Sequence, residues 1–336
     1  MRIGIIGTGR IAKRFVPECE SVSGAEITAV YNPHEGSGER FVENLWKKEP
    51  GKEGSPGSSC CDNDERGSKS PRAFEKIEEL WPEVDAVYIA SPHETHYNYI
   101  MTSLEQGKHV LCEKPMTLDK DEASRAFLVA KNKGLVLMEG IKTAYCPGYK
   151  KLLEVMGSGV IGEVRYIESC FTKLEKPGVR ELTDRKFGGS FRELGSYVCL
   201  PILDIFGSGY EDVRFSSLYN DQGIDVFTKA DFVYDGRLAT AICGLGVKRE
   251  GSLMISGTLG YIQASAPWWK TTHFEVHFED ASRVEVYDAE FAGDGLRYEI
   301  EEFVRRTGGT IEPEEIAGEQ DRSMAIAKLM ECFGRV

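Results

Sequence analysis

The chain has 336 residues, enough for about two domains, and its 41% hydrophobic and 28% charged residues are typical of globular proteins with sizeable cores. Its formal net charge of −13 and pI near 5.1 argue against nucleic acid or an anionic membrane as partner, because both bind basic surfaces. An anionic small molecule is not excluded, since it needs only a local basic pocket.

The start of the chain and the cysteines bear on the compartment. The first residues run into a strand-like segment, RIGIIG, without a charged-then-apolar leader, and no apolar run is long enough to cross a membrane. The nine cysteines are odd in number and none forms a CxxC pair. We therefore expect a cytoplasmic protein with reduced thiols, no membrane partner and no metal site.

The first 140 residues alternate between strand-like and helix-like segments. Continuous apolar runs predict parallel strands that are covered on both faces. Asp119 and Glu122 form a capping box, and Gly134 is a stop signal for the same helix. The pattern predicts a doubly wound parallel sheet in a domain spanning 1–140. The expected strands are 2–6, 26–30, 84–90, 109–112 and 135–138.

Residues 47–72 interrupt this alternation. They are rich in Gly, Pro and Ser and contain no aliphatic or aromatic residue, so they cannot bury a core. We expect a mobile surface insert that leaves the third strand short or irregular. Cys60 and Cys61 within it are either a redox or metal handle or, as we favour, incidental thiols of a solvated loop.

From residue 141 onward, apolar and polar residues alternate. The alternation is clearest in 224–234 and 274–279, and it predicts a large, mainly antiparallel sheet with one covered face. We therefore assign 141–336 to a second domain of the α+β class. The expected strands are 163–171, 213–219, 224–234, 237–245, 252–262, 274–278 and 284–286, with helices at about 190–206, 295–307 and 314–333.

The sequence GTGRIA, residues 7–12, follows the first strand and opens the first helix. The first glycine makes the turn, the second lets a pyrophosphate approach the backbone, and Ala12 lets helix and strand pack closely. The helix N-terminus adds unpaired N–H groups and a partial positive charge. The motif predicts a dinucleotide cofactor; the alternative is a glycine turn that binds nothing. The predicted contacts are Gly7, Thr8, Gly9, Arg10 and Ile11.

The end of the second strand bears on the choice between NAD and NADP. NAD sites usually place Asp or Glu there for the ribose 2′-hydroxyl, whereas NADP sites have an Arg nearby. This chain has Asn32, which binds either ribose without repelling a 2′-phosphate, and His34 and Arg40 follow it. We predict NAD or NADP, with Asn32 among the contacts.

Ligands of such sheets bind at the carboxyl ends of the strands. Ser91, Pro92 and His93 follow the strand at 84–90, and we predict that they contact the cofactor. His96 is placed with them, although a helix-start histidine with a structural hydrogen bond is the alternative.

The neighbouring strand, in GKHVLCEKPM at 107–116, ends in Glu113, Lys114 and Pro115. The residue before a proline is held in an extended shape, so the position of Lys114 is fixed. An adjacent carboxylate orients a lysine and keeps it charged. Alone, the stretch is typical of a strand end that reaches solvent; beside the dinucleotide motif it predicts that Glu113 and Lys114 line the site.

Residues 188–197, GGSFRELGSY, enter a predicted helix. Glu193 and Tyr197 are four residues apart and share one face of it. Either Tyr197 is a core residue with a satisfied hydroxyl group, or it reaches a site.

Taken together, these segments resemble the Gfo/Idh/MocA oxidoreductases, the glucose–fructose oxidoreductase and inositol dehydrogenase family. The matching pieces occur in family order over 1–206: GTGRIA, VDAVYIASPHETH, GKHVLCEKP, MEG, SGVIGEV and GGSFRELGSY. The resemblance implies an NAD(P)-binding Rossmann domain and a second domain whose open sheet often joins subunits into homodimers or homotetramers. It also implies oxidation or reduction of sugars, polyols and their derivatives, including dihydrodiols.

The resemblance also assigns roles to residues. The family's catalytic lysine matches Lys114, and its acid/base residue matches Tyr197. The family's aspartate matches Glu193, a conservative departure. An arginine that often follows MEG is replaced by Ala144, which bears on the substrate.

We hypothesise that hydride passes between a secondary alcohol carbon and the nicotinamide while Lys114 or Tyr197 transfers the hydroxyl proton. A lysine charge about 4 Å from the phenol is worth roughly 4 kcal/mol at an effective dielectric of about 20, or about three pKa units. We therefore expect Lys114 to lower the pKa of Tyr197 toward neutrality and to stabilise the alkoxide.

Basic and aromatic residues around the presumed pocket are candidates for substrate contact, although surface ion pairs and core packing are the alternatives. The basic group consists of Lys142, Lys173, Arg180, Arg192 and Lys270. Tyr145 and the pair Trp268–Trp269 complete the set, with Trp268 expected to stack on a sugar ring. Two other functions stay open: glycoside hydrolysis with NAD as a transient oxidant, and dinucleotide sensing without catalysis.

Overall fold

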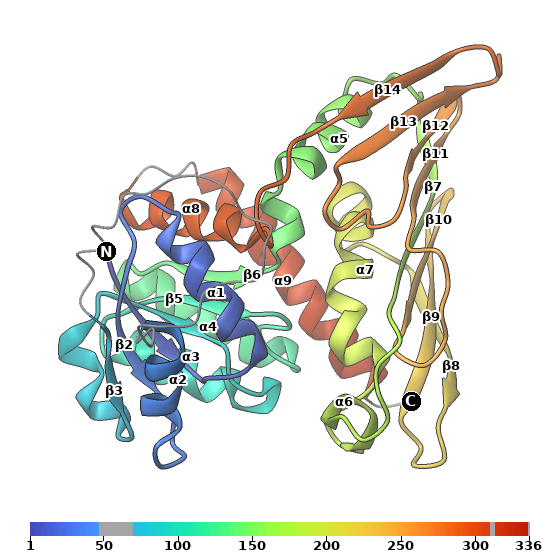
Figure 1. Cartoon of the computed structure of the whole chain (residues 1–336). Helices are drawn as coiled ribbons and strands as arrows, with labels where there is room; N and C mark the ends of the chain where they lie inside the picture. The colour runs from blue at the N-terminus through green and yellow to red at the C-terminus, as the bar shows by residue number, and fades with distance from the viewer. Residues whose placement is uncertain (47–69, 310–312, 335–336) are drawn as a thin grey trace, which may run out of the picture.

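The computed structural model describes residues 1–46, 70–309 and 313–334, and it forms two sheets with helices between them (Figure 1). The expected insert, with Cys60 and Cys61, lies almost entirely outside the described residues. The boundary expected at 140 and 141 stays a prediction, because the chain crosses between the two halves more than once.

The first sheet is parallel throughout and has the order β3-β2-β1-β4-β5-β6. This is the doubly wound order typical of Rossmann domains, as predicted. Its strands are β1 (Arg2–Ile6), β2 (Glu26–Tyr31), β3 (Arg72–Phe74), β4 (Ala86–Ile89), β5 (His109–Glu113) and β6 (Leu137–Gly140). The helices are α1 (Arg10–Glu20), α2 (Ser37–Trp46), α3 (His96–Glu105) and α4 (Lys120–Lys133), with short 3₁₀ turns η1 (Ile77–Glu79), η2 (Trp81–Glu83), η3 (His93–Thr95) and η4 (Lys142–Tyr145).

Helix α4 shows how local sequence sets its limits. The Asp119 carboxylate accepts a hydrogen bond from the Glu122 N–H, and Gly134 ends the helix with a φ of 65°. Both signals were predicted, because a carboxylate satisfies a free N–H at the start and glycine tolerates the left-handed conformation at the end.

The second sheet has the order β14-β13-β12-β11-β7-β10-β9-β8 and is antiparallel except where β7 meets β10. Helix α7 (Ser190–Phe206) packs on its inner face. The predicted strand at 252–262 is two strands, because Thr258 and Leu259 turn the chain. The strands are β7 (Val164–Thr172), β8 (Asp212–Tyr219), β9 (Asp225–Tyr234), β10 (Arg237–Gly244), β11 (Leu253–Gly257), β12 (Gly260–Ala264), β13 (His273–Phe278) and β14 (Val284–Asp288).

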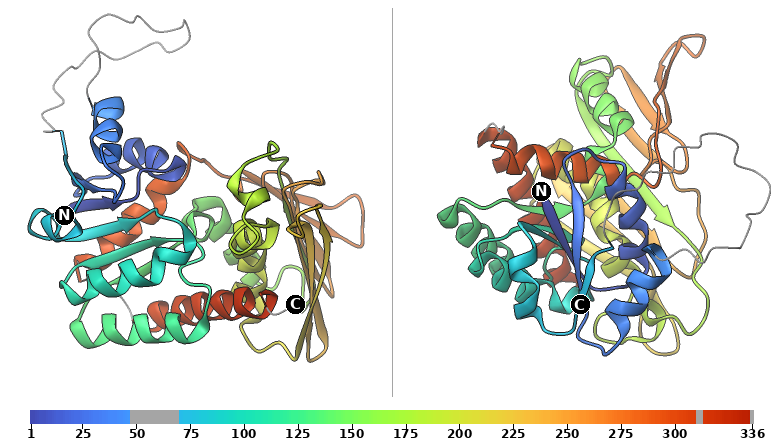
Figure 2. Two further views of the ribbon diagram at one scale, coloured as in Figure 1. Left: turned by 90° about the horizontal axis from the view of Figure 1, so that it is seen from below. Right: turned by 60° about the vertical axis from the view of Figure 1, so that its left-hand side comes forward.

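Helix α7 and part of α9 (Pro313–Phe333) lie between the two sheets, and Figure 2 shows the second sheet as one outer wall of the molecule. The second half also contains helices α5 (Pro147–Gly157) and α6 (Arg180–Thr183). Helix α8 (Leu296–Thr307) packs on α1, and α9 packs on both α4 and α7. The C-terminal helices therefore fix the Rossmann sheet against the second half.

In the described part of the chain, no helix is long and apolar enough to span a membrane, and no group of His, Cys, Asp and Glu side chains is arranged to hold a metal ion.

Candidate active site

A cavity of about 910 Å³ lies between the two halves of the molecule. One wall comes from the carboxyl ends of β1, β2, β4 and β5, and the other comes from α7, the end of β7 and the loop before β13. A ligand of a doubly wound sheet is expected at this edge.

The glycine-rich turn forms the floor of the cavity. The cavity is lined by Gly7, Thr8, Gly9, Arg10 and Ile11, and their contact with the cofactor stays a prediction. Gly7 has a φ of +101°, and a Cβ there would lie 2.7 Å from the Ala90 carbonyl oxygen, so only glycine fits. Among the residues that the structure describes, no side chain caps the start of α1, which leaves its N–H groups open to a pyrophosphate. The turn fits a dinucleotide.

Asn32 lines the cavity at the end of β2 but uses its amide internally. Its Nδ2 donates to Thr8 Oγ1 at 2.7 Å, and its Oδ1 accepts from the His34 N–H at 2.9 Å. Ser37 lines the cavity beside it, and the Arg40 guanidinium donates to Ser37 Oγ at 3.1 Å. No carboxylate from this turn lines the cavity in the described residues, so the site accepts a 2′-phosphate without charge repulsion.

Ser91, Pro92 and His93 line the cavity after β4, and their contact with the cofactor stays a prediction. His96 does not, and its placement among the cofactor contacts is corrected. Its ring is fully buried, with Nδ1 2.9 Å from the Pro115 carbonyl oxygen and Nε2 2.9 Å from that of Ser91. His96 therefore ties together the loops that follow β4 and β5, a structural role.

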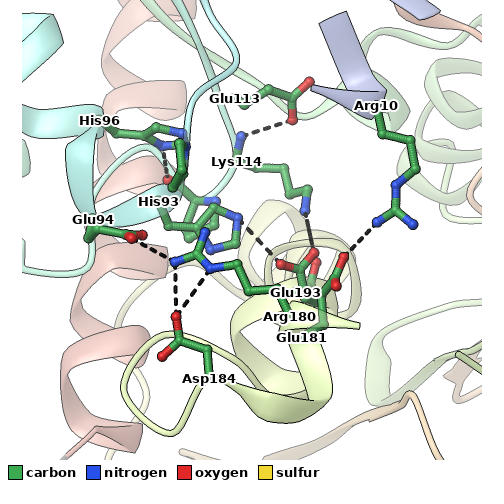
Figure 3. Close-up of polar contacts among 12 residues, drawn as sticks. Arg10, His93, Glu94, His96, Glu113, Lys114, Arg180, Glu181, Asp184 and Glu193 are labelled. Carbon is green, nitrogen blue, oxygen red and sulfur yellow. Dashed lines mark hydrogen bonds and ion pairs between the residues drawn. The ribbon is translucent and has the colours of Figure 1, made fainter. Parts of the chain in front are cut away.

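Lys114 projects from the end of β5 toward α7 (Figure 3). Its Nζ donates to the Glu193 carbonyl oxygen at 2.9 Å and lies 3.8 Å from the Glu193 carboxylate. The same ammonium lies 5.5 Å from the ring centre of Tyr197. The three predicted catalytic residues thus meet in one wall of the cavity.

Glu113 precedes Lys114 in the chain and is held in place by two hydrogen bonds. Its carboxylate accepts the Tyr88 hydroxyl at 2.6 Å and the Lys114 N–H at 3.3 Å. Burial raises the pKa of Glu113, while the charge of Lys114 opposes that rise. Burial and the nearby charge of Lys114 lower the pKa of His93 well below its ordinary value, so His93 is neutral near pH 7.

The predicted lowering of the Tyr197 pKa is wrong. Burial raises the pKa of Tyr197 well above its ordinary value, and the charges of Glu113 and Glu299 raise it further. The physical reason is that the Lys114 ammonium lies over the ring and donates to a carbonyl, whereas carboxyl groups flank the phenol. Near neutral pH, Tyr197 is therefore protonated and not a phenolate.

The predicted substrate residues divide into two groups. Lys142 and Lys173 line the cavity, together with Trp269 and Lys270. Lys142 is buried and donates to the Asp294 carbonyl oxygen at 2.6 Å, and burial lowers its pKa. Lys173 forms an ion pair with Glu175.

Trp268 and Tyr145 lie outside the cavity lining, so their assignment to substrate is corrected. Trp268 is 0% exposed and its Nε1 donates to the Cys170 carbonyl oxygen at 2.8 Å. Tyr145 is buried, and its hydroxyl donates to Glu319 at 3.2 Å. Trp269 takes the position in the wall and stacks on Phe171, with ring centres 3.6 Å apart. Trp268 thus belongs to the core, the alternative considered for this pair.

Some lining residues had no sequence signal. Phe171 ends a strand that fits any half-buried sheet, and Arg14 falls one turn beyond the glycine motif. Thr95 and Tyr99 lie close to the predicted Ser91–His93 segment. Arg192, which was named with the basic group, is not part of the lining.

Segment 175–189, here called the strap, contacts the Rossmann domain through ion pairs (Figure 3). Arg10 donates to Glu181 at 2.6 Å, and Arg180 donates to Glu94 at 2.6 Å. These pairs hold the strap beside the glycine-rich turn.

Comparisons with known proteins place this site in a family. A model described as an oxidoreductase family with an NAD-binding Rossmann fold matches residues 1–141. The chain is also 26% identical to scyllo-inositol 2-dehydrogenase (NADP(+)) from Bacillus subtilis over 352 aligned positions, covering 98% of this chain and 95% of that enzyme. Residues 1–141 of the chain belong to the Gfo/Idh/MocA oxidoreductase family. NAD(P) is its cofactor, as predicted.

Other known proteins that are similar to this chain are also dehydrogenases or reductases. The chain is 30% identical to trans-1,2-dihydrobenzene-1,2-diol dehydrogenase from Bos taurus over 215 residues, and the alignment spans 62% of this chain and 64% of that enzyme. The fold matches a crystal structure of a 3-ketoreductase from Actinomadura kijaniata in complex with NADP and TDP-benzene, with a TM-score of 0.78, 24% identity, and coverage of 99% and 96%. These relatives favour hydride transfer over glycoside hydrolysis or dinucleotide sensing.

Proposed function

We propose that this chain is an NAD(P)-dependent dehydrogenase or reductase acting on a secondary alcohol or ketone of a sugar, polyol, sugar derivative or dihydrodiol. The observation that carries this proposal is the meeting of Lys114 and Tyr197 in one cavity with the glycine-rich turn. When bound, the cofactor supplies or accepts the hydride at its nicotinamide.

Lys114 and Tyr197 divide the remaining work. The Lys114 ammonium polarises the substrate oxygen and stabilises the charge that develops on it. The Tyr197 hydroxyl has no hydrogen-bond partner within the described residues, so it is free to give a proton to that oxygen in reduction. Because the pKa of Tyr197 is raised, it is protonated and ready to donate over the neutral range.

The walls of the cavity support a substrate that is polyhydroxylated and anionic. The stacked Trp269 and Phe171 present a flat apolar surface next to Tyr197, whose ring centre is 5.5 Å from that of Phe171. Aromatic faces of this kind pack against sugar and cyclohexane rings. Lys142, Lys173 and Lys270 add positive charge to the cavity lining, which favours a carboxylate or phosphate group.

We extend the proposal to assembly and location. The outer face of the second sheet carries exposed apolar residues, among them Leu238 and Val286, and we propose that it joins copies of the chain into a dimer or tetramer. A cytoplasmic location also stays a proposal, based on the nine cysteines that we expect to be reduced.

A substrate screen tests the function. Sugars, polyols, nucleotide sugars, dihydrodiols and their ketones are incubated with each cofactor, and NAD(P)H absorbance is followed. We expect net cofactor turnover with at least one alcohol or ketone. Release of a sugar from a glycoside without net cofactor turnover would instead support hydrolysis.

A further inference from the structure

A buried carboxyl group that the proposed chemistry does not use lies behind the cavity. Glu299 is in the first turn of α8, its side chain is 0% exposed, and neither carboxyl oxygen has a hydrogen-bond partner in the described part of the chain. An unpaired carboxylate in an apolar interior is costly, and such a group usually takes up a proton.

Glu299 lies beside the strand ends that carry the catalytic lysine. Its two carboxyl oxygens are 3.5 and 3.6 Å from the position that a Cβ atom on Gly140 would occupy. Gly140 ends β6 and is the register partner of Glu113 on β5. The missing side chain at Gly140 therefore leaves room for the Glu299 carboxyl next to Glu113.

The charges around the two carboxyl groups allow two protonation states. Burial raises the pKa of both, and the charge of Glu113 raises that of Glu299 further. Lys114 and Lys142 oppose this rise at Glu113, and Lys142 opposes it at Glu299. With one proton on the pair, the four groups carry a net charge of about +1; with none, two carboxylates balance two ammonium groups. Other titratable groups nearby are Arg14, Glu18, Tyr88, Cys146 and Tyr197.

We propose that Glu113 and Glu299 hold one proton between them and exchange it with Tyr197 through one bridging water, so that Glu299 is a proton store for the reaction. A water is needed in this route because the described residues give neither Glu299 oxygen a direct hydrogen-bond partner. In ketone reduction, the carbonyl carbon gains the hydride and the carbonyl oxygen takes the Tyr197 proton. The carboxyl pair then returns a proton to the phenolate, becomes doubly ionised and regains a proton from water. Oxidation reverses each step. This role rests on the proposed function, and Glu299 acts through Tyr197 without touching the substrate.

Infrared spectroscopy tests the shared proton without any turnover. At pH 7, we expect the wild type to show the carbonyl stretch of a buried protonated carboxyl group, and Glu299→Gln to lose that band. Glu299→Asp keeps a carboxyl group and should keep a shifted band if Gln disturbs folding. Glu139→Gln, which removes another buried carboxyl group whose Oε1 accepts from the Met116 N–H at 2.8 Å, is the control and should leave the Glu299 band. A spectrum that does not change in Glu299→Gln would overturn the proposal.

A single-turnover experiment tests the store in the reaction. With a substrate from the screen and a pH indicator, wild-type proton uptake from water should lag behind cofactor oxidation. In Glu299→Gln, uptake should coincide with cofactor oxidation, and turnover should fall roughly tenfold with a steeper loss at high pH. Coincident traces in the wild type would contradict the store even if the enzyme is active. If the screen yields no substrate, the proposed function fails while the infrared result still decides whether the pair holds a proton.

Discussion

At the scale of single residues, the position of Lys114 depends on both halves of the molecule. The Rossmann strand β5 carries its backbone, and the Glu193 carbonyl on α7 accepts its ammonium. The catalytic wall therefore exists only where the two halves meet, which explains why the strand-end motif and the helix motif occur 79 positions apart in the chain.

Tyr197→Phe tests the proton donor. We expect at least a roughly tenfold loss of turnover with unchanged cofactor affinity, because the ring keeps its packing while the hydroxyl is lost. Steady-state kinetics and fluorescence titration with NADPH measure the two effects. Tyr261→Phe, on the outer face of the second sheet, is the matched control. Near-normal turnover of Tyr197→Phe would contradict the proposal that Tyr197 donates the proton.

Asn32→Asp tests the cofactor site. An aspartate would still accept the His34 N–H and could receive the Thr8 hydroxyl, so the turn is preserved. Its charge repels a 2′-phosphate and binds a 2′-hydroxyl. We expect the kcat/KM ratio of NADP to NAD to fall roughly tenfold. An unchanged ratio would show that the ribose lies away from Asn32.

The residues that sequence could place at the cavity are those whose position is fixed by backbone constraints, and their roles stay predictions. Gly7 and Lys114 are identified by a turn that only glycine fits and by a proline that fixes the preceding residue. Trp268 and Trp269 had to be separated by the structure, because they are neighbours in a loop without periodicity. The Tyr197 pKa depends on Glu299, which is 102 positions away in the chain and looks like any other helix residue.

At the scale of elements, the strap connects the second half to the dinucleotide turn through partly exposed ion pairs. Such pairs are worth up to about 1 kcal/mol each and are screened by salt. We expect Glu181→Gln to leave Arg10 with its weaker ion pair to Glu175 at 3.7 Å and to speed cofactor dissociation about two- to fivefold, as followed by stopped-flow fluorescence. Glu163→Gln, which breaks an exposed pair with Arg165 far from the cavity, is the control. Equal dissociation rates in both variants would argue against a role of the strap in retaining the cofactor.

The lowered pKa of Glu302 on α8 leads us to expect that the free energy of unfolding falls at acid pH. Burial raises its pKa, but hydrogen bonds from Arg305 and Arg306 outweigh that effect and lower the pKa to about 2. Because the folded pKa lies below the unfolded value of about 4.5, this stabilisation is present above pH 4.5 and is lost as pH falls toward 2.

Glu302→Gln should therefore lower Tm at pH 7 by an amount that corresponds to roughly 1–3 kcal/mol, and the difference should vanish near pH 2. Thermal unfolding at a series of pH values measures it, with the exposed neighbour Glu301→Gln as the control. A difference in Tm that does not depend on pH would mean that packing, and not the charge of Glu302, is responsible.

Most helices and strands were predictable from sequence, because the spacing of apolar residues and the residues that cap helices are local features of the chain. Helix α7 has the predicted bounds, and the parallel strands follow their apolar runs. The division of 252–262 was missed because apolar Leu259 occupies the turn between β11 and β12.

At the scale of the whole molecule, the second sheet leaves its outer face without a described helix over it (Figures 1 and 2). Register places Leu238 next to Tyr166, and Tyr261 stacks on His277 in the same row of side chains. Leu238 is 53% exposed. We expect Leu238→Lys to shift the assembly toward monomers in analytical ultracentrifugation, because an unpaired charge opposes burial. A wild type that sediments as a monomer would contradict the proposed interface.

The sequence did not predict that α8 and α9 pack against helices of the Rossmann domain. Helix α8 has an ordinary amphipathic pattern, which says that one face is covered but not by which domain. Helix α9 has no clear apolar stripe, so its sequence does not indicate which of its faces are covered. This return also places Glu299 behind the cavity, so the global arrangement sets the chemistry of the site.

The central claim, that Lys114 and Tyr197 carry out hydride-coupled proton chemistry beside a bound NAD(P), is tested most directly by Lys114→Met. Turnover of the best substrate from the screen is followed by NAD(P)H absorbance, and cofactor binding is titrated in parallel. We predict a loss of turnover of roughly 100-fold or more with cofactor affinity within about twofold of wild type. Turnover equal to that of the wild type would contradict the account.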